Sequence, residues 1–299
     1  MRNAVIGIGS NSVRLLVADA VEGKIVPVLR DRCGTRLFAG LKDGALTPES
    51  IEVSSAAARE MERKAREAGA GAIYIFATSA VRDAKNREEF AQRILSMAGL
   101  ELEVCSGEEE ARLSYAGAAL GGRCGMIDIG GGSTEITLGD GDDVLGAVST
   151  QMGAVRFHRQ FPIDSPESFE SVAQEAIKIL KADAQKVSVL ARPDAWVGVG
   201  GTFTSLGAMD KQLATFDRTL VEGYPLDRER VRAWGHQLSV MPLEERLRLP
   251  GLQPQRADIV AHGVAILLGC MVHFDIKTIR VSDKGNLDGF LRKKLLKKC

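Results

Sequence analysis

Hydrophobic positions along the chain alternate between two periods. Segments with a helical period are introduced by helix-start signals, as where Thr47 precedes Pro48 and Glu49. Short apolar runs typical of buried strands lie between the helical segments, at 4–8, 72–77, 102–105, 126–129, 195–199 and 276–281. Regular alternation of strands and helices predicts an α/β protein in which helices cover the sheets.

Two strand–turn–strand segments share one design. Each is an apolar strand, a turn rich in glycine and serine, and a second strand, at 6–17 and at 127–138. With an offset of 121 residues, Ile6, Ile8, Gly9, Ser12 and Asp19 align with Ile127, Ile129, Gly130, Ser133 and Asp140. A repeat at this separation indicates a duplicated domain. We expect domains at 1–122 and 123–299 that bring both hairpin turns to one central cleft.

Glycine-rich turns of this kind can present backbone N–H groups to an anion, and phosphate is the natural candidate. Asp128 ends the strand before the second turn, where a carboxylate would meet a phosphate only through a cation such as Mg²⁺. A plain β-turn is the alternative. A third glycine-rich turn, Gly200-Gly201-Thr202, opens a predicted helix.

Two further candidates come from loops that follow strands of the first half. Arg82 lies in the loop after the strand at 72–77, where its fork could bind phosphate oxygens; a solvated arginine is the alternative. A helix starts at Ser106 with three glutamates. Glu109 has capping-box spacing to Ser106 and Glu108 can pair with Arg112, which leaves Glu110 leaning inward as a candidate general base. Alternatively, all three acids merely suit a helix N-terminus.

Composition restricts the partners and the compartment. The chain has 299 residues with 39 basic and 39 acidic side chains, so no overall field favours nucleic acid. Five cysteines without CxxC spacing indicate reduced thiols rather than disulfides or a zinc site, and the histidines lack metal-ligand spacing. The start of the chain has no signal-peptide pattern, and the longest apolar stretch, 259–274, is too short to span a membrane. We expect a cytoplasmic protein.

These motifs, taken in order, resemble the Ppx/GppA phosphatases, which comprise exopolyphosphatases and guanosine pentaphosphate phosphohydrolases of the actin, hexokinase and Hsp70 superfamily. The resemblance rests on IGIGSNSVRLLV at 6–17, ATSAVRDAKN at 77–86, SGEEEARL at 106–113, IDIGGGSTE at 127–135, VGVGGT at 197–202, LPGLQPQRADIVAHGVAIL at 249–267 and RVSDKG at 280–285. It implies a duplicated actin-like (ribonuclease H-like) α/β fold in a short, two-domain form.

The resemblance also implies roles for individual residues. Glu110 would activate the attacking water, Asp128 would hold Mg²⁺ (or Mn²⁺), and Glu135 would assist; Glu110 is also a candidate metal ligand. Terminal phosphates would be held by Ser10, Asn11, Ser12, Arg82, Gly130, Gly131, Gly132 and Ser133. The chemistry expected is in-line attack of water on a terminal phosphoryl group. A homodimer is expected from the resemblance alone.

Two departures from the family pattern affect this expectation. Relatives usually have IDIGSNS in the first hairpin, but Gly7 occupies the place of the aspartate and also aligns with Asp128 in the internal repeat. The usual GLREG is replaced by Gly285-Asn286-Leu287-Asp288-Gly289, so a basic contact is missing. A metal site without one of two facing carboxylates should bind its ion more weakly.

Four functions therefore compete. The leading hypothesis is an exopolyphosphatase that removes orthophosphate from the end of inorganic polyphosphate, and guanosine pentaphosphate is the closest alternative substrate. Because of Gly7, the protein could instead sense polyphosphate or (p)ppGpp with little turnover. A kinase of the same superfamily would use the same hairpins, although the glutamate-rich helix disfavours it.

Overall fold

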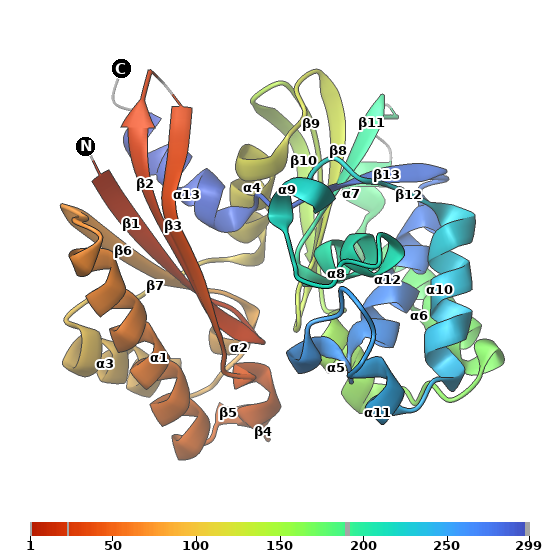
Figure 1. The fold of residues 1–299 in the computed structure, drawn as a ribbon, viewed down its shortest axis with the longest axis horizontal. Helices are drawn as coiled ribbons and strands as arrows, with labels where there is room; N and C mark the ends of the chain where they lie inside the picture. Colours follow the sequence, from red (N-terminus) through yellow and green to blue (C-terminus); the bar gives the residue numbers. More distant parts are fainter. Residues whose placement is uncertain (1, 23, 189–191, 297–299) are drawn as a thin grey trace. The chain divides into compact units, whose positions relative to one another are not determined.

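The computed structural model describes residues 2–22, 24–188 and 192–296 (Figure 1). They form two compact units. The first contains the chain up to Gly117 and the segment from Asn286 onward, and the second is Ala118–Gly285. This division differs from the expected domains because the C-terminal helix belongs to the first unit, where its apolar residues join the first core. The repeat carries no signal for this return of the chain.

In the first unit a five-stranded sheet has the order β3-β2-β1-β6-β7. The first three strands form an antiparallel meander, and β6 and β7 run parallel to β1. Its elements are β1 (Arg2–Ile8), β2 (Ser12–Val21), β3 (Lys24–Gly34), η1 (Leu37–Gly40), β4 (Leu41–Lys42), β5 (Ala45–Leu46), α1 (Pro48–Glu67), β6 (Ala72–Ala77), α2 (Ser79–Arg82), α3 (Arg87–Ala98), β7 (Glu103–Val104), α4 (Gly107–Ala118) and α13 (Asn286–Leu296).

The second unit repeats this topology in a six-stranded sheet, β10-β9-β8-β11-β13-β12. A meander of β8, β9 and β10 continues into parallel β11 and β13, with antiparallel β12 at the edge. Its elements are β8 (Arg123–Ile129), β9 (Thr134–Asp140), β10 (Asp143–Thr150), α5 (Ala154–Gln160), α6 (Pro166–Asp183), α7 (Gln185–Ser188), β11 (Ala195–Val199), α8 (Gly201–Asp210), α9 (Arg218–Val221), β12 (Pro225–Asp227), α10 (Arg228–Val240), α11 (Leu243–Arg246), η2 (Pro254–Arg256), α12 (Val260–His273) and β13 (Thr278–Ser282).

The predicted duplication is confirmed in the register of the two hairpins. Ile8 pairs with Val13 in the first, and Ile129 pairs with Thr134 in the second, 121 residues further along. Both turns are closed by the same bond, from Gly9 N–H to the Ser12 carbonyl and from Gly130 N–H to the Ser133 carbonyl, each at 3.0 Å. The predicted fold class, a duplicated actin-like α/β fold with two domains, is therefore confirmed.

Helices cover both faces of the first sheet. α1 and α3 lie side by side over one face (Figure 1). On the other face, Leu287 and Phe290 of α13 and Leu113 of α4 pack with Val5 of β1 and Phe76 of β6. Because side chains alternate along a strand, β1 contributes to both layers.

In the second unit the buried helix predicted at 259–274 is α12, which packs against α6, α8 and α10. Gly269 lets the helix approach α6 closely, since a Cβ there would lie 2.7 Å from the Ala173 carbonyl oxygen. In the described part of the chain no helix combines the length and the apolar character needed to cross a membrane.

Local sequence signals were confirmed where the side chain had no competing partner. Thr47 caps α1 by accepting from Ser50 N–H at 3.3 Å. Asn86 precedes α3 but does not cap it through its side chain, because the Asn86 amide oxygen accepts from Leu46 N–H at 2.8 Å instead. That contact ties the start of α3 to β5, the short strand before α1.

Four of the five cysteines are described, and all are free thiols. Cys33 is exposed, whereas the other three are buried: Cys105, Cys124 and Cys270. Burial raises the pKa of the Cys105 and Cys270 thiols to about 12, so they stay protonated at neutral pH. The expectation of reduced thiols holds for these four; Cys299 lies outside the described residues.

Candidate active site

The turn of the first hairpin is tied to the protein through its carbonyl groups. The Asn11 carbonyl accepts from the N–H groups of Thr35 and Arg36 at 3.1 Å each, and the Ser10 carbonyl accepts from Phe38 N–H at 2.8 Å. In a trans peptide the N–H points opposite to the carbonyl, so the N–H groups of Asn11 and Ser12 point away from these partners. The Asn11 side chain is 7% exposed, yet its Nδ2 has no hydrogen-bond partner.

Arg82 lies on a short helix that starts beside this hairpin. The loop is fixed by Thr78 N–H, which donates to the Ile8 carbonyl at 3.1 Å. The Arg82 guanidinium is half-buried; its Nη1 donates to the Cys105 carbonyl at 3.1 Å and to Glu110 Oε2 at 3.0 Å, and its buried Nη2 has no partner. Arg82 is therefore a positioned side chain with a spare donor, and not a solvated loop arginine.

The sorting of the three glutamates on α4 is confirmed. Glu109 and Ser106 form the capping box, with Glu109 Oε2 accepting from Ser106 N–H at 3.0 Å and Ser106 Oγ from Glu109 N–H at 3.2 Å. Glu108 pairs with Arg112 on the surface at 2.8 Å. Glu110 is 6% exposed and faces Arg82. Of the three glutamates, only Glu110 is buried, and it is the one that contacts Arg82.

The second hairpin turn is held in the same way as the first. The Gly131 carbonyl accepts from the N–H groups of Val155 and Arg156, at 2.9 and 3.0 Å, and the Gly132 carbonyl accepts from Arg156 Nε at 2.7 Å. By the same trans geometry, the N–H groups of Gly132 and Ser133 point away from α5. Arg156 was not predicted; its distance of more than twenty residues from the turn gave no local signal.

Asp128 and Glu135 are directly opposite each other on β8 and β9, so their side chains lie on one face of the sheet. Both are buried, at 8% and 1% exposure, and Glu135 Oε1 accepts from Ser149 Oγ at 2.7 Å. Two adjacent carboxylates suit Mg²⁺, which typically takes one or two protein carboxylates and completes its shell with water and phosphate. Within 2–22, 24–188 and 192–296, no cluster of three or more acidic, histidine or cysteine ligands exists.

The third glycine-rich turn lies against Asp128. Gly200 has φ +96°, and a Cβ there would lie 2.9 Å from Asp128 Oδ1 and 2.8 Å from the Ile129 carbonyl oxygen. Glycine is therefore required both by the backbone conformation and by the space. This contact assigns the VGVGGT motif to the surroundings of Asp128, which its sequence position alone did not indicate.

The predicted site residues fall into two groups, one in each unit. Ser10, Asn11, Ser12, Arg82 and Glu110 belong to the first. The second holds Asp128, Gly130, Gly131, Gly132, Ser133 and Glu135. Within each unit, the strand pairing and the bonds described above bring these residues together at the ends of the central strands.

Ser79 was missed by sequence reasoning. It is 1% exposed, its Oγ has no hydrogen-bond partner, and it is the first residue of α2, the short helix that carries Arg82. The sequence could have indicated Ser79, because its hydroxyl lies between the buried strand at 72–77 and the candidate Arg82.

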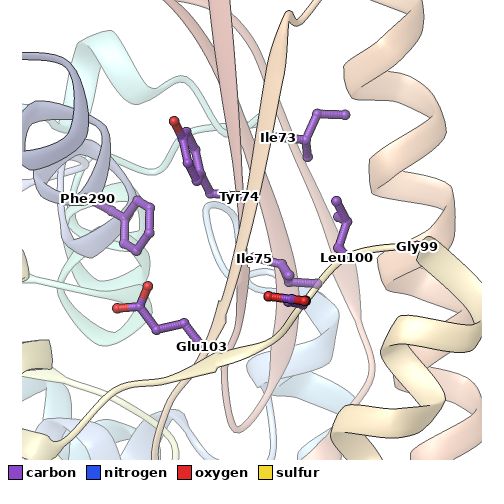
Figure 2. A pocket seen from close by; sticks show the side chains of 8 residues that line it. Ile73, Tyr74, Ile75, Gly99, Leu100, Glu103 and Phe290 are labelled. Atoms are coloured by element: carbon purple, nitrogen blue, oxygen red, sulfur yellow. The ribbon is translucent and has the colours of Figure 1, made fainter.

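A pocket of about 350 Å³ at the edge of the first sheet contains none of the predicted residues. Figure 2 shows Tyr74, Glu103 and Phe290 beside β6, with Leu100 on the other side of that strand. Lys294 covers the Tyr74 and Phe290 rings and lies 3.8 Å from Glu103, so a side chain of the protein already meets these groups. The candidate chemistry lies elsewhere, at the hairpins.

Comparison with known proteins decides the family. The model of the Ppx/GppA phosphatase family matches residues 16–298. The chain belongs to this family. Exopolyphosphatase 2 of Mycobacterium tuberculosis is a relative that is 29% identical over 283 residues, which cover 89% of this chain and 88% of the relative.

Solved Ppx/GppA structures have the same fold. A PPX-GPPA enzyme of Aquifex aeolicus is 32% identical with a TM-score of 0.83, over 98% of this chain and 99% of that one. An exopolyphosphatase from Cytophaga hutchinsonii is 23% identical with a TM-score of 0.89, over 99% and 98% of the two chains, and at that identity it supports the fold alone. The resemblance identified from the motifs is thereby confirmed.

Proposed function

We propose that this Ppx/GppA protein is an exopolyphosphatase that hydrolyses the terminal phosphoanhydride bond of inorganic polyphosphate. The first unit supplies the general base, Glu110, and donors for the terminal phosphate. The second unit supplies the carboxylates for a metal ion and a second set of phosphate donors at Gly130, Gly131, Gly132 and Ser133.

The observation that carries this proposal is the buried pair of Glu110 and Arg82, 3.0 Å apart beside the first hairpin. A base needs a fixed carboxylate, and a phosphate needs unsatisfied donors nearby. Arg82 Nη2 and Asn11 Nδ2 are buried donors without partners, and such groups cost free energy unless a ligand satisfies them. Phosphate oxygens are acceptors that match both groups.

The chemical step follows from these roles. Glu110 accepts a proton from a water molecule while the water oxygen attacks the terminal phosphorus. The P–O bond to the bridging oxygen breaks in line, and the shortened polyphosphate leaves as an anion together with orthophosphate. Arg82 and the hairpin N–H groups neutralise the charge on the equatorial oxygens.

Asp128 and Glu135 are the residues proposed to hold Mg²⁺ or Mn²⁺. When bound, the divalent ion would neutralise phosphate charge and orient the chain. Both carboxylates are buried on one face of β8 and β9, and the Gly200 turn limits the space around Asp128. Loss of Asp128 should therefore abolish Mg²⁺-dependent phosphate release.

The test is phosphate release by purified Glu110→Gln, with Glu109→Gln as the matched control one residue away. Loss of a general base should lower kcat by about 10²- to 10⁴-fold. Glu109 is a helix cap, so its variant should keep kcat and lose only some thermal stability. An unchanged rate in Glu110→Gln would refute the assignment of the base.

Guanosine pentaphosphate is the alternative substrate, and assays of both compounds under one condition would separate the two. A sensor that binds polyphosphate or (p)ppGpp with little turnover is the second candidate, favoured by Gly7, which leaves the first hairpin without an acid. Tight binding of either compound without phosphate release from wild-type protein would support the sensor and contradict the enzyme.

A further inference from the structure

Gly7 lies in the centre of the first sheet, directly opposite Arg14 on β2 and beside Phe76 on β6. Its missing side chain leaves no open space. A Cβ at residue 7 would lie 3.0 Å from Cδ1 of Leu287 and 3.3 Å from Cζ of Phe76. These distances are tighter than ordinary van der Waals contact, so the larger carboxylate of an aspartate would require Leu287 to move.

In each unit, four residues paired across neighbouring strands form a row, and the two rows differ in charge. The row in the second unit consists of Val199, Asp128, Glu135 and Ser149. In the first unit the same row reads Phe76, Gly7, Arg14 and Arg32. Burial and the neighbouring charge of Arg14 lower the pKa of Arg32 to about 10. An acidic pair in one unit thus corresponds to glycine and arginine in the other.

Leu287 is held firmly above Gly7. At the start of α13, Asn286 Oδ1 accepts from Arg14 Nη2 at 3.0 Å, and Asp288 forms an ion pair with Arg30. One turn later Phe290 stacks on Phe76 with ring centroids 5.0 Å apart. Anchors on both sides of Leu287 keep its side chain in the space above residue 7.

We propose that Leu287 occupies the place of a side chain at residue 7 and thereby excludes a metal-binding carboxylate from the first hairpin. The two departures from the family pattern, at residue 7 and in the segment 285–289, are then one coupled change. This deepens the proposed function: the acids for the metal come from Asp128 and Glu135 alone. Arg14, the charged neighbour of residue 7, is already engaged by Asn286.

The test is a double-mutant cycle on thermal stability with Gly7→Asp, Leu287→Ala and the combination. Gly7→Asp alone should lower the Tm by about 5 °C or more, because it overpacks the core against Leu287. Gly7→Asn, of the same size without charge, should lower the Tm almost as much. In the double variant the Tm should be no lower than in Leu287→Ala alone, since the space has been opened. Additive losses, or a Gly7→Asp variant as stable as wild type, would overturn the proposal.

A second readout is the rise in Tm caused by Mn²⁺, used as the probe for the divalent ion. Gly7→Asp should show the same rise as wild type, and the double variant a larger rise because the first hairpin then carries an accessible carboxylate. A larger rise in Gly7→Asp alone would contradict the blocking role of Leu287. No rise in the wild type would count against the metal in the proposed function, while the stability cycle still decides the role of Leu287.

Discussion

Replacing Arg82 by methionine removes the partner of a buried carboxylate while keeping most of the side-chain volume. Glu110 and Arg82 side chains are only 8% and 17% exposed, and their charged atoms are 3.0 Å apart. At an effective dielectric constant near 20, two unit charges at that separation attract by about 5.5 kcal/mol. Part of this offsets desolvation, and removing one partner of a buried pair typically costs about 3 kcal/mol. The bond to the Cys105 carbonyl contributes about 1 kcal/mol to the loss.

Denaturant unfolding would measure this loss, and Glu110→Gln supplies the matched second change. If Arg82→Met destabilises the protein by removing the arginine partner of Glu110, adding Glu110→Gln should restore about 2 kcal/mol, because glutamine carries no charge in that buried position. Arg82→Lys should retain most of the stability and yet raise KM, since lysine lacks the fork that reaches both Glu110 and a phosphate. The reasoning fails if the double variant is less stable than Arg82→Met alone.

Three other predictions concern the second unit. Asp128→Ala should abolish Mg²⁺-dependent phosphate release and the Mn²⁺-induced rise in Tm, whereas the exposed Asp140→Ala should change neither; a metal response that survives in Asp128→Ala would contradict the metal assignment. Gly200→Ala should cost about 3 kcal/mol in denaturant unfolding, because φ is +96° and the Cβ would meet Asp128; Gly141→Ala, with φ +58° and open space, should cost only about 1 kcal/mol, and equal losses would refute the role of the close approach. Burial lowers the pKa of His262 to about 4, so the folded state resists protonation; stability should fall as pH drops from about 6.5 towards 4, less steeply in His262→Gln, and parallel pH curves for the two proteins would contradict this.

Sequence patterns predicted the structure correctly wherever interactions between residues close in sequence determine it. The strand at Ala72–Ala77, the cap at Thr47 and the sorting of the glutamates on α4 depend on neighbours within a few residues. The repeat predicted the duplicated hairpins because the offset of 121 residues is preserved in the strand register. These features are encoded by short-range periodicity and capping.

Contacts between distant segments could not be predicted in this way. The Asn86 side chain accepts from a backbone N–H of β5 instead of capping α3, since this partner 40 residues away competes for its amide oxygen. The return of α13 to the first unit depends on Leu287, Phe290 and their core neighbours, which no local signal connects to β1. Pairing of Asp128 with Glu135 follows from the hairpin register, which the sequence left unassigned.

The two rows across the central strands explain how a duplicated domain can yield two different chemical environments. Main-chain geometry is preserved, down to the 3.0 Å bond that closes each turn, so each hairpin presents its N–H groups in the same manner. The side chains of one residue pair beside each turn have diverged: the pair is Gly7 and Arg14 in one unit and Asp128 and Glu135 in the other. A basic row attracts phosphate directly, whereas an acidic row requires a cation. Substrate binding by the first unit should therefore persist without divalent ions. Loss of all substrate binding after chelation of divalent ions would contradict the claim that the basic row binds phosphate directly.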